Sequence, residues 1–66
     1  MEIKIEIKQE EIRNSLYMIN ICINDGEPIK YQIREKLSDK KVKELEAYLK
    51  RHINNMMMNV IIDFFV

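Results

Sequence analysis

Several residue types are scarce in this chain of 66 residues, and each scarcity excludes a kind of structure. Cys22 is the only cysteine, which excludes an internal disulfide, and His52 is the only histidine. Together they fall short of the four cysteine or histidine ligands of a structural zinc site. The sequence therefore predicts no metal site and no cofactor.

Long hydrophobic runs are also missing, since no uninterrupted apolar run exceeds four residues. A membrane-spanning helix needs about 20. The N-terminal stretch alternates charged and apolar residues and lacks the apolar core of a secretory signal. With 33% charged and 47% hydrophobic residues, the chain is predicted to be a globular, cytoplasmic protein without membrane contact, folded as one small α/β domain over residues 1–66.

Alternating hydrophobicity predicts three strands in the first half of the chain. Residues 1–9 alternate between isoleucine and polar residues, as a strand with one buried face does. Residues 15–24 are apolar on both faces, which is typical of a central strand covered on both sides. A third alternating stretch follows Pro28, whose missing N–H suits the start of an edge strand.

The turn between the second and third strands is predicted from Asn24, Asp25 and Gly26. They suit a three-residue hairpin loop in which Gly26 adopts the left-handed conformation. A loop of this length also fixes the register of the two strands. It pairs apolar residues throughout: Ile21 with Ile29, Ile19 with Tyr31, and Tyr17 with Ile33.

An amphipathic helix is predicted from Ser38 onward. Ser38 suits the N-cap and Asp39 the first turn, while Asn54 and Asn55 can end the helix. Apolar residues follow at helical spacing: Val42, Leu45, Leu49 and Ile53. Oppositely charged residues four positions apart should support the helix, namely Asp39 with Lys43, Lys40 with Glu44, and Glu46 with Lys50.

The apolar tail, residues 54–66, alternates again and is predicted to be a fourth strand. The predicted fold is α+β, a two-layer βββαβ sandwich with a four-stranded, mostly antiparallel sheet and one helix on one face. A right-handed crossover would place the last strand parallel to the first, in the sheet order 4-1-2-3.

One helix covers only one face of such a sheet, so the other face should stay open. The predicted open face holds apolar residues of the second and fourth strands: Leu16, Met18, Cys22, Met57, Ile61 and Phe65. Apolar patches of this kind usually mark an interface, and small domains are often completed by oligomerisation, as dimers or higher assemblies. Two alternatives stay open: coverage by lysine and arginine stems, and a different protein as partner.

Charge is balanced overall but uneven along the chain. Residues 30–52 hold eight basic residues against four acidic ones, and residues 1–29 hold three against six. Candidate anion-binding residues are Lys30, Arg34, Lys36, Tyr48 and His52. A structural role competes with this interpretation, because lysines on an edge strand block unwanted pairing and a histidine at a helix end commonly packs its ring and caps the helix.

These features predict a protein without enzymatic activity. The first hypothesis is a small homo-oligomeric regulator or inhibitor of a larger protein, of the kind encoded by phages and mobile elements, acting through the open face. The alternative is an oligomer that binds a small anionic ligand, such as a nucleotide, in clefts between subunits. Nucleic-acid binding through the basic strand is the weakest hypothesis, since the net charge is zero.

Overall fold

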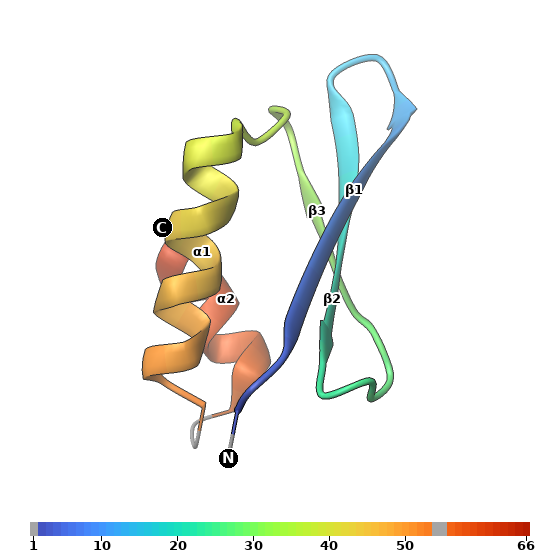
Figure 1. Ribbon diagram of the computed structural model, residues 1–66. Coiled ribbons are helices and arrows are strands. Elements are labelled where there is room, and N and C mark those ends of the chain that lie inside the picture. Colours follow the sequence, from blue (N-terminus) through green and yellow to red (C-terminus); the bar gives the residue numbers. More distant parts are fainter. Residues whose placement is uncertain (1, 54–55) are drawn as a thin grey trace.

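The computed structural model describes residues 2–53 and 56–66 (Figure 1). Its elements follow the order β1 (Ile5–Arg13), β2 (Leu16–Ile23), β3 (Ile29–Ile33), α1 (Asp39–Arg51) and α2 (Met57–Phe65). The strands form one antiparallel sheet in the order β1-β2-β3. Both helices lie on the same side of this sheet, and the other side carries no helix (Figure 1).

The predicted meander and its register are confirmed. In β2 and β3, Ile21 faces Ile29 and Ile19 faces Tyr31. On the other side of β2, Ile5 of β1 faces Ile23. Facing residues of paired strands project to the same side of the sheet. The odd-numbered isoleucines therefore form one continuous apolar layer beneath the helices.

The turn between β2 and β3 differs from its prediction at Gly26. The residues with positive φ are Asn24 (52°) and Asp25 (61°), and Gly26 does not share this conformation. Asparagine and aspartate tolerate the left-handed region better than other residues with a side chain. Gly26 instead allows a close approach. Its N–H donates to the Ile23 carbonyl at 3.0 Å, and an added Cβ would lie 3.1 Å from that oxygen, so the backbone there would have to shift slightly.

Helix α1 begins as predicted. The Ser38 hydroxyl accepts a hydrogen bond from the Lys41 N–H at 3.2 Å, and Leu45 and Leu49 are fully buried. Of the predicted ion pairs, the structure forms Glu46 with Lys50, at 3.3 Å. The helix is capped by His52, whose N–H donates to the Leu49 carbonyl. The predicted stop at residues 54 and 55 lies outside the described residues.

The predicted fourth strand is wrong, because Met57–Phe65 form helix α2; residues 54 and 55 of the predicted strand lie outside the described residues. Its core-facing residues recur at spacings of three and one, the pattern of a helix: Met57, Val60, Ile61, Phe64 and Phe65. The sheet therefore has three strands, and the predicted order 4-1-2-3 with a parallel crossover does not occur. The fold is α+β, with a three-stranded antiparallel sheet covered on one side by two helices.

All five elements and the linker before α1 contribute to the core. Its buried residues are Ile5, Ile19, Ile21, Ile33, Leu37, Leu45, Leu49, Val60 and Ile61. Gln9 fixes the linker to β1, because its side-chain amide bonds both the N–H and the carbonyl of Leu37, each at 2.9 Å. Across residues 2–53 and 56–66, neither helix is long and apolar enough to cross a lipid bilayer.

Candidate functional site

The open face of the sheet carries three apolar side chains on its middle strand, with the polar Asn20 between the second and the third. Leu16, Met18 and Cys22 of β2 point to this side and are half-buried. Polar and charged side chains flank the row, since Met18 lies between Glu10 of β1 and Gln32 of β3. We call Leu16, Met18 and Cys22 the open-face row. It is narrower than the predicted patch, because a helix replaces the fourth strand.

The six predicted interface residues therefore do not share one surface. Met57, Ile61 and Phe65 belong to α2, on the helix side of the sheet. Ile61 is fully buried, and the Phe65 ring stacks on Tyr31 with centroids 5.3 Å apart. A charge at either position would disrupt the core rather than an interface. Of the six predicted residues, Leu16, Met18 and Cys22 lie on the side without helices.

Tyr48 and His52 form part of an aromatic contact between the two helices. Their ring centroids are 4.6 Å apart, and Tyr48 also lies 5.5 Å from Phe64 of α2. His52 thus packs its ring and caps α1, as the structural interpretation proposed. Neither residue lines the hollow that contains Arg34 and Lys36, and Lys30 projects from the opposite face of the sheet. The predicted anion-binding set is divided among three places.

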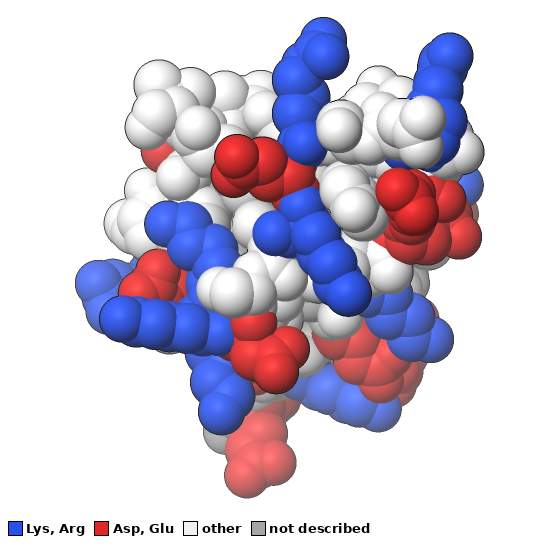
Figure 2. All heavy atoms as spheres, turned by 90° about the horizontal axis from the view of Figure 1, so that it is seen from above, with Lys and Arg blue, Asp and Glu red and all other residues white. Residues whose placement is uncertain are grey.

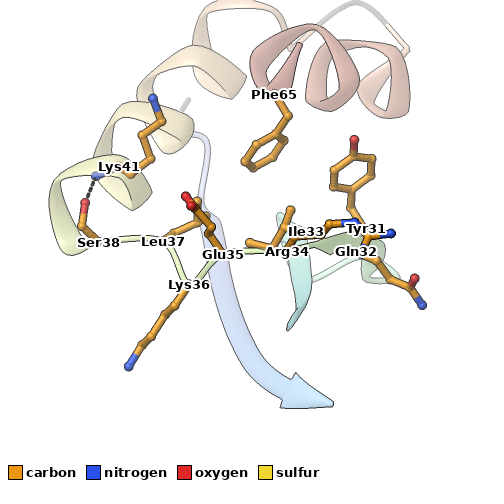
Figure 3. Close-up of a pocket in the computed structure, with 10 residues that line it drawn as sticks. All are labelled: Tyr31, Gln32, Ile33, Arg34, Glu35, Lys36, Leu37, Ser38, Lys41 and Phe65. Carbon is orange, nitrogen blue, oxygen red and sulfur yellow. Dashed lines mark hydrogen bonds between the residues drawn. The ribbon is translucent and has the colours of Figure 1, made fainter. Parts of the chain in front are cut away.

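A hollow of about 540 Å³ lies beside β3 and the linker that follows it (Figure 3). Its lining residues are Tyr31, Gln32, Ile33, Arg34, Glu35, Lys36, Leu37, Ser38, Lys41 and Phe65. The lining residues thus include two aromatic rings, three cations and one carboxylate. Sequence reasoning missed Lys41 and Phe65 as lining residues. Phe65 was assigned to a strand, and Lys41 reaches the hollow from the first turn of α1, directly after the linker that lines it.

The cations of this hollow do not converge on one point. Figure 3 shows Tyr31 and Phe65 on one side of the β3 backbone, whereas Lys36 and Gln32 extend to the other side. The Lys41 ammonium lies 3.7 Å from the Glu44 carboxylate and 5.3 Å above the Phe64 ring centroid. The hollow is therefore an aromatic recess with a basic rim, not a closed anion cage.

Charges of both signs alternate over the end of the molecule that carries the β1–β2 turn and the start of α1. Figure 2 shows basic side chains interspersed with acidic ones in this view, without a continuous basic surface. Nearby opposite charges weaken the attraction that an extended phosphate backbone would feel. The arrangement favours a structural role for these lysines over nucleic-acid binding.

In residues 2–53 and 56–66, no three His, Cys, Asp or Glu residues are grouped to hold a metal ion. The pKa of Lys4 is raised, first by its hydrogen bond to Glu6 at 3.3 Å and then by the charge of Asp25 at 3.6 Å. These exposed contacts tie the start of the chain to the β2–β3 turn and serve the fold.

Comparison of the chain with protein-family models, with curated proteins and with solved structures finds no significant match. Function has to be inferred from the surfaces themselves.

Proposed function

We propose that this chain is a non-enzymatic binding protein, a small homo-oligomeric regulator or inhibitor of a larger protein, which acts through the open face of its sheet. The open-face row supports the proposal. Both helices pack on the opposite side, so no helix of residues 2–53 and 56–66 covers the row (Figure 1). Antiparallel sheets commonly face solvent on one side, but then that side is usually polar along its middle strand.

Met18 is the central residue of this surface. It lies across from Glu10 on one side and Gln32 on the other, so a small apolar centre is surrounded by polar side chains. Interfaces commonly combine an apolar centre with a polar rim. Methionine is also enriched in interfaces because its flexible thioether adapts to different partners.

The proposal is tested by placing a charge in the centre of the row. Met18→Lys should still fold, because the new ammonium would lie opposite Glu10, and cross-strand pairs of opposite charge are favourable. We expect the variant to form a smaller assembly than the unmodified chain in native mass spectrometry. The matched control is Met58→Lys, which changes an exposed methionine of α2 on the other side of the sheet.

The two variants give a clear decision. If Met18→Lys and Met58→Lys both keep the assembly of the unmodified chain, the open face is not an interface and the proposed function is wrong. If only Met18→Lys dissociates, the same pair of variants identifies the regulated protein, because that protein should be captured by Met58→Lys and lost with Met18→Lys.

A second candidate function is the binding of a small anionic ligand with a ring, such as a nucleotide. It is favoured by the hollow beside β3, whose lining residues include the rings of Tyr31 and Phe65 and the basic residues Arg34, Lys36 and Lys41. Titration with ADP while recording amide NMR shifts tests it. Shifts confined to residues 31–41 and to Phe65, and lost in Arg34→Gln, would support the site. An unchanged spectrum at millimolar ADP would exclude it.

A further inference from the structure

Strand β3 has a free edge. Among residues 2–53 and 56–66, its backbone forms hydrogen bonds to β2 alone. The hollow described above lies beside the end of this strand, since Tyr31, Gln32 and Ile33 line it together with residues 34–38 of the linker. An exposed strand edge is a template for pairing with another strand. The edge thus has both unpaired backbone groups and space beside them.

The other edge of the sheet is less suited to pairing with itself. β1 contains a bulge between Glu11 and Arg13, a feature that disrupts the regular ladder at sheet edges. A two-fold pairing of β1 about Ile7 would also set Ile5 against Gln9, whose amide is already bonded to Leu37. These features direct attention to β3.

The geometry of the sheet restricts how β3 could pair with β3 of a second copy. Opposed residues of antiparallel strands project to the same face. Tyr31 and its odd-numbered neighbours face the helices, whereas Lys30 and Gln32 face the open side. Odd-numbered residues must therefore meet odd-numbered ones, which places a two-fold axis on a residue rather than between residues. Only axes at Lys30, Tyr31 and Gln32 keep most of the strand paired.

Charge eliminates two of these three axes. An axis at Lys30 would place Lys30 opposite Lys30 of the second copy. An axis at Gln32 would place Lys30 of each copy opposite Arg34 of the other. Like charges directly opposite one another destabilise a sheet. An axis at Tyr31 instead sets Lys30 against Gln32 and pairs Tyr31 with Tyr31 of the second copy. It also pairs Ile29 with Ile33, so the apolar layer under the helices continues into the second copy.

We propose that β3 pairs with β3 of a second copy, antiparallel and about a two-fold axis at Tyr31, to give a continuous six-stranded sheet. Within the paired strands, this axis sets no like charges opposite one another. Beyond the strands, the antiparallel arrangement brings the turn of one copy, with Asp25 and Glu27, toward residues 34–36 of the other, which carry Arg34 and Lys36 but also Glu35. The paired strands are short, so the dimer should be weak and dependent on concentration.

Gln32 offers a direct test, because its predicted partner is Lys30 of the second copy. Gln32→Glu would create two favourable ion pairs in each dimer, and Gln32→Lys would create two repulsive ones. Gln32 is exposed, and the residue opposite it on β2 is the uncharged Met18. Both variants should therefore fold equally well. By sedimentation equilibrium we expect Gln32→Glu to raise the association constant about five-fold and Gln32→Lys to lower it about five-fold. The double variant Lys30→Glu with Gln32→Lys should restore association.

The opposite effects of Gln32→Glu and Gln32→Lys on the association constant distinguish this pairing from association through the open face. Gln32 lies at the rim of that face, where a charge of either sign would weaken apolar packing. Equal weakening by both variants, or no effect of either, would overturn the β3 pairing. Met18→Lys separates the two surfaces further, because it should remove open-face assembly and leave the β3 dimer intact. A Met18→Lys protein that stays monomeric at about 1 mM would also contradict the pairing.

Discussion

Gln9 and Leu37 are 28 positions apart and form two hydrogen bonds with each other, each 2.9 Å long. The Gln9 side-chain nitrogen donates to the Leu37 carbonyl, and its side-chain oxygen accepts from the Leu37 N–H. The Gln9 side chain thus satisfies the Leu37 backbone groups in the way that a neighbouring strand would. It fixes the path of the chain from β3 to α1 and thereby the position of α1 over the sheet.

Replacement of Gln9 by alanine should therefore destabilise the fold. Two partly buried backbone groups of Leu37 would lose their partners, which should lower the free energy of unfolding by about 2 kcal/mol. Urea denaturation followed by circular dichroism measures this change. Gln32→Ala is the matched control, because Gln32 is exposed on β3, and it should change stability by less than about 0.5 kcal/mol. Equal effects would show that the Gln9 bonds add nothing.

The turn at Asn24 can be divided into its two contributions. Asn24 has a φ of 52°, and its side-chain oxygen accepts the Lys4 N–H at 2.9 Å. Asn24→Gly removes the side-chain bond but suits the positive φ, whereas Asn24→Ala removes the bond and strains the backbone as well. We expect alanine to be less stable than glycine by about 1 kcal/mol in thermal unfolding. An alanine variant as stable as the glycine variant would contradict the left-handed conformation.

The helical nature of the tail predicts unequal effects at two adjacent isoleucines. Ile61 is fully buried, and Ile62 is 38% exposed. Ile61→Ala should lower the free energy of unfolding by about 3 kcal/mol because it leaves a cavity in the core. Ile62→Ala should change it by less than about 0.5 kcal/mol. Chemical denaturation of both variants tests the assignment, and a larger loss at Ile62 would mean that another face of α2 is buried.

The raised pKa of Lys4 predicts a small dependence of stability on pH. Because Glu6 and Asp25 raise the pKa above its usual 10.5, the folded state holds this proton more tightly than the unfolded state. Their contribution to stability is fully present below pH 10.5 and is lost as the pH rises through the folded-state pKa. Lys4→Met should lack this loss, so the stability difference between it and the unmodified chain should shrink above pH 10.5. A constant difference across that range would rule out the linkage.

The sequence predicted the meander correctly because the register of a hairpin follows from two local features. Loop length sets which residues meet, and alternation sets which face each residue occupies. Tyr17 through Ile33 satisfied both conditions without a slip. Helix α1 was predictable for a similar reason. Ser38 indicated where the helix begins, and the apolar residues from Val42 to Leu49 indicated which face is buried.

The tail could not be assigned by the same means. Most of residues 57–66 are apolar, so their pattern fits the two-residue period of a strand as well as the 3.6-residue period of a helix. The β-branched and aromatic residues among them favoured a strand. What decides between the two is the rest of the fold. One helix would leave part of the inner face uncovered, and α2 fills that space with Val60 and Ile61. Three of the six predicted interface residues lie on α2 instead of the open face, because the prediction had placed them on that strand.

Cys22 is the only thiol of the chain, and it lies half-buried on the open face. Its rate of alkylation therefore measures how often that face is covered, without any label having to be introduced. A partner seated on the open-face row should slow the reaction, whereas growth of the sheet at β3 leaves the face of β2 accessible to the reagent. The lone cysteine thus provides the molecule with its own footprinting site.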